Sequence, residues 1–225
     1  MDKKASSSSE IKPPMADELL KYYTKDQLRM HFMSLGLSSK SVGFKPQVYM
    51  KEEEKVGVDP VLKEGNLLTN VFNRLIRSCF YTLQSLNKNI TTVEVSQKIK
   101  DLAEKAVFEY ERHMYNQDFH RIAYVLDEYI REMNKYWTNN IKDDELKIQV
   151  VADCLYACKV IAILIHPIAP EGCEMFKAYL NIDDEIWNWD NIFEPINFYF
   201  KDGENHKFKF LEPKVDFFKK MDYQY

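Results

Sequence analysis

The sequence predicts an all-α protein, an antiparallel helix bundle that carries a small C-terminal β-hairpin. Apolar residues recur at helical spacing over long stretches, and only 6 Gly and 8 Pro occur among the 225 residues, too few for a many-stranded fold. The connections between the predicted helices are short, which favours antiparallel neighbours. We divide the chain into an N-terminal loop and linker segment (1–60), a helical bundle (61–195) and a C-terminal hairpin extension (196–225).

The N-terminal segment begins with a basic loop. Residues 1–14 are rich in lysine and serine and end in two prolines, a composition that buries little apolar surface. A helix or helix pair is expected between Asp17 and Leu35. Residues 36–60 contain three glycines and two prolines and are expected to form an irregular connector.

Four long helices are expected in the bundle. In residues 67–83 the apolar side chains fall in adjacent pairs four residues apart, which places them on one face of a helix. Helices are also expected over 93–115, over 118–137 and over about 144–166; the last is apolar around most of its circumference and should be the central one. The sequence His166-Pro167 and the following Pro170 end it before a short helix over 171–180.

The last part of the chain suggests two strands. The alternating pairs Phe198-x-Phe200 and Phe208-x-Phe210 lie on either side of Asp202-Gly203, a turn sequence. We therefore expect a β-hairpin there.

Composition excludes several classes of protein. The net charge of −4 means that any nucleic-acid contact must come from a local basic face. The four cysteines lie in apolar patterns without a Cys-x-x-Cys pair, as expected of reduced, buried thiols in a cytoplasmic protein. The most apolar stretch, 150–165, is too short to span a membrane and contains Asp153 and Lys159. The sequence contains no phosphate-binding glycine loop, nucleophile elbow or zinc-spaced set, so no metal site is expected.

The polar face of the 67–83 helix is a candidate RNA-binding surface. Asn70 and Arg74 are four residues apart, so their side chains project side by side. An amide and a guanidinium presented together can contact the Watson–Crick edge of an unstacked base. The alternative is a solvated helix face without a ligand.

Two further candidates lie elsewhere in the chain. Trp137 follows Tyr136 at the end of a predicted helix, where an indole can stack on a splayed base; the alternative is a core side chain. Lys4 lies in the basic N-terminal loop and can reach a phosphate as a point charge; the alternative is a plain flexible tail.

The order of these features resembles that of methionyl-tRNA synthetases. Lys4-Ala5-Ser6-Ser7-Ser8 is similar to the Lys-Met-Ser-Lys-Ser signature of class I aminoacyl-tRNA synthetases, with Ala5 and Ser7 as departures. Residues 16–29 resemble the segment that follows this signature, which ends in an aspartate and a Leu-Arg pair. His166-Pro167-Ile168-Ala169-Pro170-Glu171 resembles the proline-broken corner of class I anticodon bundles.

Two motifs within the predicted bundle point to the methionine enzyme. Residues 66–74 are similar to the first helix of its anticodon domain, and residues 118–122 and 129–137 to the helix that ends in its anticodon tryptophan. The resemblance covers most of residues 3–195 and implies a helical bundle of the class I anticodon-binding type. It implies that Asn70 and Arg74 contact anticodon bases, that Trp137 stacks on the first anticodon base, and that Lys4 stabilises ATP phosphates during adenylate formation.

The resemblance also implies partners. The expected RNA is tRNA(Met), and the expected protein partner is a catalytic domain, in cis or as a separate subunit, which uses ATP and Mg. The family's Rossmann sheet and His-Gly-His motif are not in this sequence, so this chain alone, which needs no cofactor of its own, is expected to be inactive. One alternative is a catalytically inactive protein–protein interaction module, favoured by the net negative charge and the acidic stretch 183–194. Another is the anticodon domain of a different class I synthetase, specific for leucine, cysteine or valine.

Overall fold

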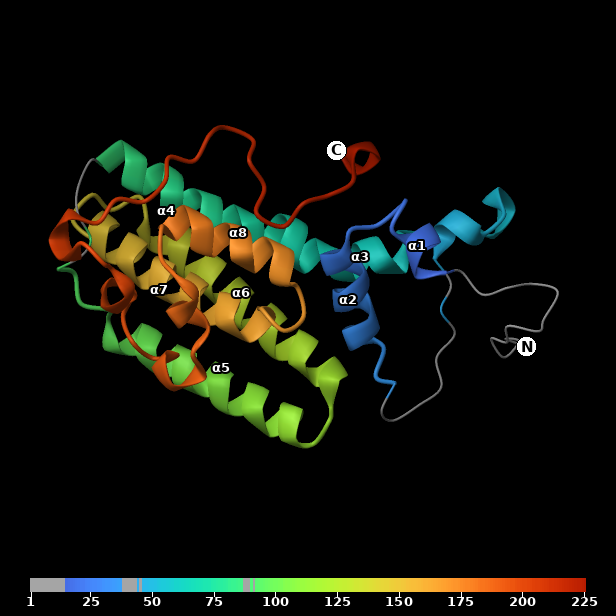
Figure 1. Ribbon diagram of the computed structural model, residues 1–225, viewed down its shortest axis with the longest axis horizontal. Helices are drawn as coiled ribbons and strands as arrows, with labels where there is room; N and C mark the ends of the chain where they lie inside the picture. The colour runs from blue at the N-terminus through green and yellow to red at the C-terminus, as the bar shows by residue number, and fades with distance from the viewer. Residues whose placement is uncertain (1–14, 38–43, 45, 87–89, 91) are drawn as a thin grey trace.

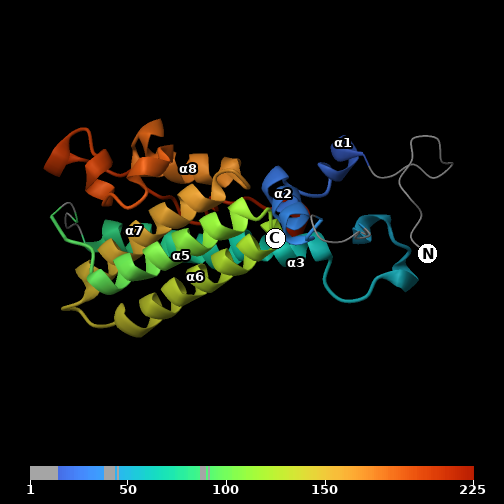
Figure 2. The same ribbon diagram turned by 90° about the horizontal axis from the view of Figure 1, so that it is seen from below.

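The protein is described by a computed structural model that covers residues 15–37, 44, 46–86, 90 and 92–225. Its α-helices are α1 (Ala16–Leu19), α2 (Lys25–Ser34), α3 (Pro60–Asn66), α4 (Asn73–Leu86), α5 (Gln97–Tyr115), α6 (Phe119–Asn140), α7 (Lys147–Ile165) and α8 (Pro170–Leu180). Figures 1 and 2 show α4 to α8 packed side by side as a bundle, with α1, α2 and α3 beyond one end of it. The all-α prediction is confirmed over the described residues.

One long rod joins the two parts of the molecule. It consists of α3, a π-helical segment (Leu67–Phe72) and α4, which follow one another without a break (Figure 1). The rod begins at Asp59, whose carboxylate accepts a hydrogen bond of 2.8 Å from the Val61 amide, with Pro60 in the first turn. The predicted 67–83 helix is therefore the middle of a longer one, and the π-helical segment within it carries Asn70.

The centre of the bundle is α7, as predicted. Every residue from Val150 to Ile165 is buried, because α4, α5, α6 and α8 surround the helix. The helix is long and apolar enough to cross a membrane, but 89% of its most apolar window is buried within the bundle, as in the core helix of a water-soluble fold. All four cysteines are buried and free, which confirms that prediction too.

The short helix α2 holds the corner between α7 and α8. The Asp26 carboxylate accepts hydrogen bonds from the amides of Gly172 (2.9 Å) and Glu171 (3.3 Å), and so caps the N-terminus of α8 from another segment. One turn later Arg29 donates to the carbonyls of Ile168 and Pro167, both at 2.6 Å. Burial raises the pKa of Asp26, an effect that the two amides oppose. The proline-broken corner is thus the point where the linker and the bundle are joined.

The acidic stretch after α8 is also fixed to the bundle. The Trp187 indole stacks on His166 with ring centroids 4.0 Å apart, and Trp189 packs against Tyr110. Lys159 of α7 is fully buried and donates hydrogen bonds to backbone carbonyls of the acidic stretch, including that of Glu194 at 2.8 Å. Burial lowers the pKa of this lysine to about 7.

The predicted C-terminal β-hairpin is wrong, since residues 196–225 contain short 3-10 turns and no strand. The aromatic residues of the two expected strands do not pair on a sheet: Phe200 stacks on His206, and Phe208 packs edge-on against Phe80 of α4. Backbone donors of this region are used by helices, since the Lys209 amide donates to the Tyr179 carbonyl at the end of α8. Phe200 and Phe208 thus pack against the core while Phe198 and Phe210 remain exposed, an alternation that a local pattern cannot distinguish from a strand.

Residues 211–225, here called the C-terminal tail, run antiparallel to α4 and return to α2 and α3 (Figures 1 and 2). Contacts follow one another along the helix: Leu211 bonds to Gln84, Asp216 to Arg77, Phe218 to Asn73 and Lys220 to Asn70. The central contact is the strongest, because Asn73 is fully buried and makes two bonds to the Phe218 backbone, at 2.8 and 2.9 Å. The tail therefore covers part of the helix face on which the candidate RNA-binding residues lie.

Candidate nucleic-acid interface

The predicted site residues lie on two neighbouring helices, except Lys4, which falls outside the described residues. Arg74 is exposed on α4, and its Nε donates to Oδ1 of Asn134 on α6 at 3.2 Å. Trp137 lies three residues after Asn134, one turn further along the same face of α6. Asn134 also donates through Nδ2 to the Ile130 carbonyl at 2.9 Å, which fixes its orientation. The structure therefore brings Arg74 to the end of α6 that carries Trp137.

Trp137 is half-buried at the last turn of α6. It packs against the bundle core, so part of the indole is held by apolar neighbours while the rest remains accessible to solvent. Trp137 can therefore serve both as a core side chain and as a stacking surface for a base. An indole that is supported on one side loses little conformational entropy when a base stacks on it.

Asn70 turns toward the C-terminal tail rather than toward α6. Its Oδ1 accepts a hydrogen bond of 2.6 Å from the Lys220 ammonium, and its Nδ2 donates to Oδ1 of Asn66. Lysine has no acceptor, so Lys220 fixes which end of the Asn70 amide is the oxygen. That choice fixes Asn66 in turn, because the Asn70 nitrogen must meet an acceptor. Both asparagines consequently direct free N–H groups away from these bonds.

The polar face of the long rod is divided between the tail and solvent. Arg77 forms an ion pair with Asp216 at 2.6 Å, and the Tyr81 hydroxyl donates to the Glu212 carbonyl, so both are occupied by the tail. Arg74 bonds to a neutral side chain and, across the described part of the chain, has no ion-pair partner. Of the two arginines of α4, Arg74 therefore remains open to a ligand, whereas Arg77 stabilises the packing of the tail.

A polar pocket opens beside Asn70, with a volume of about 400 Å³. Three segments line it: Gln27 from α2, the residues Lys63, Asn66 and Asn70 from the rod, and Lys220 and Gln224 from the tail. Of these residues, the sequence predicted only Asn70 as a site residue. No local signal could have found Lys220, which is 150 positions away from its partner Asn70 in the sequence.

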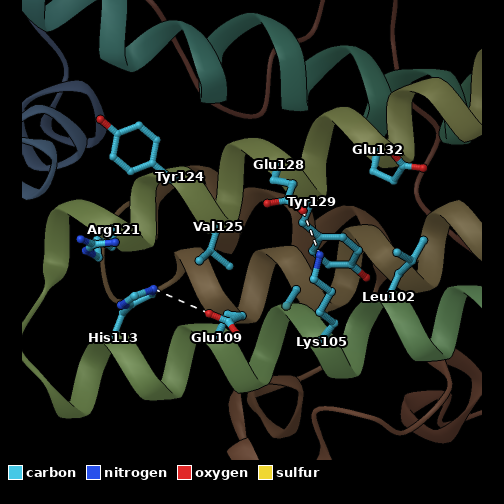
Figure 3. Close-up of a pocket in the computed structure, with 11 residues that line it drawn as sticks. Leu102, Lys105, Glu109, His113, Arg121, Tyr124, Val125, Glu128, Tyr129 and Glu132 are labelled. Atoms are coloured by element: carbon cyan, nitrogen blue, oxygen red, sulfur yellow. Dashed lines mark hydrogen bonds and ion pairs between the residues drawn. The ribbon is translucent and has the colours of Figure 1, made fainter.

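A second concavity, of about 500 Å³, is a groove between α5 and α6. Figure 3 shows several charged residues on both walls, among them Lys105 and Glu109 of α5 and Glu128 and Glu132 of α6. Lys105 of α5 and Glu128 of α6 form an ion pair of 3.0 Å across it, and Glu109 lies 3.8 Å from His113 at the other end (Figure 3). The buried Tyr129 below has a pKa raised by its burial. None of the predicted site residues lines this groove, and its charges largely neutralise one another, so it is separate from the interface.

Among the residues that the structure describes, no three His, Cys, Asp or Glu side chains come together in an arrangement that could hold an ion. The interface offers hydrogen-bond donors, a positive charge and one indole ring. These groups suit recognition of an RNA, whose phosphates and base carbonyls accept hydrogen bonds and whose bases stack.

Comparison with known proteins gives a sequence match and a structural match. No protein-family model matches the chain. Over 142 residues, 58% of this chain, it is 29% identical to a methionine–tRNA ligase of Fusobacterium nucleatum subsp. nucleatum, of which the match covers 22%. The fold is similar to the apo methionyl-tRNA synthetase of Mycobacterium tuberculosis, with a TM-score of 0.63 and 14% identity over 91% of this chain and 40% of that one.

Both matches span less than half of the similar protein, so they compare this chain with a part of a synthetase. The sequence match is independent of the fold, and the two name the same enzyme. The resemblance inferred from the motifs is thereby confirmed. This chain resembles methionyl-tRNA synthetases in its sequence, and it has the fold of a helical part of one.

Proposed function

We propose that this chain reads the anticodon of tRNA(Met) as part of a methionine–tRNA ligase. The observation that carries the proposal is the position of Arg74, which is exposed, has no ion-pair partner in the described part of the chain and bonds to Asn134 one turn from Trp137. A guanidinium that keeps its terminal N–H groups, with a partly accessible indole one helical turn beyond the residue that it contacts, suits a base that has left its stack. The resemblance to methionyl-tRNA synthetases supports tRNA(Met) as the RNA.

In this proposal each residue has a separate task. The exposed part of Trp137 stacks on the first anticodon base, which contributes about 1–3 kcal/mol. Arg74 keeps its terminal N–H groups for acceptor atoms on a base edge, because only its Nε is bonded to Asn134. Asn70 offers its remaining N–H to an acceptor, since its oxygen is occupied by Lys220. The bundle core holds these groups in place before the RNA arrives.

We propose aminoacylation as an activity of the complete enzyme and not of this chain alone. The ATP- and Mg-dependent step is assigned to a catalytic domain in the same polypeptide or in a partner subunit, and the whole assembly to the cytoplasm. Lys4 would serve that site as the first lysine of the signature loop. This chain would then supply recognition and the connection between the anticodon and the catalytic centre.

The test is binding of labelled tRNA(Met) to four variants of the chain. Trp137→Ala should weaken binding about 5- to 100-fold, the equivalent of one lost stacking contact, and Trp137→Phe should recover part of this. Arg74→Ala should weaken it at least about tenfold, as for a charge-assisted contact. Arg131→Ala is the matched control, because Arg131 is exposed on the same α6 but already paired with Asp127 at 2.8 Å.

All four variants should keep the parent's helical circular dichroism, since none removes a fully buried side chain. A tRNA(Met) transcript with a changed anticodon should bind the parent as weakly as the natural transcript binds the Trp137→Ala variant. Equal binding by the parent, Trp137→Ala and Arg74→Ala would reject the assignment. Preference for the tRNA of another amino acid would keep the fold and reject the specificity, and binding of a protein but no tRNA would reject both.

A further inference from the structure

The pocket beside Asn70 has an unusual set of side chains for a surface depression. Two lysines and four carboxamides line it, and no carboxylate does: Gln27, Lys63, Asn66, Asn70, Lys220 and Gln224. Neither Lys63 nor Lys220 has an ion-pair partner among the residues described. Asp59 does not line the pocket: it is buried, and its carboxylate accepts hydrogen bonds from the Tyr23 hydroxyl (2.7 Å) and from backbone amides. The pocket is therefore positively charged.

The hydrogen bonds within the pocket occupy the side-chain oxygens of three of its carboxamides. Lys220 donates to the oxygen of Asn70, and Asn70 donates to the oxygen of Asn66. Gln27 donates to the oxygen of Gln224 at 2.8 Å. The Gln224 nitrogen is itself engaged, since it donates to the Tyr22 carbonyl at 3.0 Å and to the Tyr223 hydroxyl at 3.2 Å. Among the donors of these bonds in the described part of the chain, the N–H groups that remain belong to Lys220, Asn70 and Gln27, since an amide nitrogen has two hydrogens and an ammonium has three. A ligand in the pocket would meet positive charge and N–H groups, which is the environment that an anion requires.

The pocket lies on the same exposed line of the rod as the proposed base contacts. Asn66 and Arg74 are eight residues apart, which corresponds to at most about 12 Å along the rod, since an α-helix rises 1.5 Å per residue and the π-helical segment between them rises less. A single RNA strand that lies along this line covers that distance with about three or four stacked nucleotides, at 3.4 Å each. An anion carried by the same RNA can thus reach the pocket while bases reach Arg74 and Trp137.

We infer that Lys63, Asn66 and Lys220 form a binding site for a backbone phosphodiester of the tRNA, three or four nucleotides from the bases that Arg74 and Trp137 contact. This inference rests on the proposed function. Asn70 is the orienting residue of the site, because its amide holds both Lys220 and Asn66. The tail thereby takes a direct part in RNA binding, although it is about 150 residues from Asn70 in sequence.

The experiment measures the affinity of the full chain for a labelled anticodon stem-loop of tRNA(Met) between 50 and 200 mM KCl. Each phosphate contact contributes about 0.7–0.9 to the slope of log affinity against log salt. Over this range Lys63→Ala and Lys220→Ala should each lose about threefold less affinity than the parent does, because each has lost one contact. Lys219→Ala is the matched control: it removes the same charge from the adjacent tail position, which is exposed and outside the pocket.

A chemical variation of the RNA identifies the phosphate itself. Stem-loops with one neutral methylphosphonate each should include a position that weakens binding to the parent and leaves binding to Lys220→Ala unchanged. Lys63→Ala should show the same position, and since Lys63 lies on α3, its result does not depend on how the tail is packed.

The outcomes separate this inference from the proposed function. If the parent discriminates the methionine anticodon but Lys220→Ala and Lys219→Ala change the salt slope equally, the phosphate site is wrong and the proposed function survives. The same holds if no methylphosphonate position depends on Lys63 or Lys220. If the parent shows no preference for the methionine anticodon, the proposed function fails, whatever the salt slopes are.

Discussion

Replacing Gly172 by alanine should destabilise the protein, although glycine is a poor helix former. Gly172 lies in the first turn of α8, where its amide donates to Asp26. A Cβ at this position would lie 2.2 Å from Cδ1 of Phe218, and two more atoms of that ring are within 2.6 Å. Helix propensity alone predicts a stabilisation of up to about 1 kcal/mol. The close contact predicts the opposite sign.

The clash is expected to dominate because the Phe218 ring has nowhere to move. It is fully buried and packs against Phe72 with ring centroids 5.5 Å apart, while its backbone is held by Asn73. Loss of a buried phenylalanine from its site costs about 3–5 kcal/mol. After subtraction of the propensity gain of about 1 kcal/mol, Gly172→Ala should lower the free energy of unfolding by about 2–4 kcal/mol.

The assay is urea unfolding of Gly172→Ala, Phe218→Ala and the double variant. Because Phe218→Ala removes the ring, the added methyl group then has space, and Gly172→Ala should stabilise that background by up to about 1 kcal/mol. The reversal of sign is the decisive result. Gly65→Ala is the control: its Cβ would lie 3.0 Å from Cγ of Gln27, a far milder contact than the 2.2 Å at Gly172, so its effect should be clearly smaller. A Gly172→Ala protein as stable as the parent would refute the reasoning.

Two further predictions concern charged groups in the core and at the linker. Burial lowers the pKa of Lys159 to about 7 in the folded protein, whereas the pKa of a lysine in the unfolded chain is about 10.4. Between these two pH values the unfolded chain binds a proton that the folded protein has released. The free energy of unfolding therefore rises with pH in this range. Urea unfolding at pH 6, 7, 8 and 9 should therefore show the parent gaining stability relative to Lys159→Met above pH 7, by up to about 1.4 kcal/mol per pH unit; a constant difference would contradict this. Asp26→Ala should cost about 1–2 kcal/mol and speed hydrogen exchange at the Gly172 amide, because α8 loses its cap, whereas Asp17→Ala on the exposed helix α1 should do neither.

The contacts of the C-terminal tail and the α5–α6 groove could not be predicted from the sequence. The sequence predicts that Asn70 and Arg74 lie side by side, because they are four residues apart and helix geometry alone makes such residues neighbours. Asn73, three residues further on, holds the tail through the Phe218 backbone, a contact between positions 145 residues apart. No periodic signal accompanies such a contact, since a backbone amide and carbonyl exist at almost every position. The same reason hid Lys220 and the α5–α6 groove.

The sequence by itself determined the helices, the buried α7 and the break at the corner before α8, because each follows from side chains three or four residues apart or from a proline. It also placed Asn70 and Arg74 side by side on one helix and Trp137 at the end of another. Only the tertiary structure decided that residues 196–225 form 3-10 turns and irregular chain instead of a hairpin, that Arg77 pairs with the C-terminal tail, and that Arg74 meets α6 through Asn134. Packing made these choices, since Phe200, Phe217 and Phe218 are buried against the rest of the protein more completely than a two-stranded sheet in water would bury them.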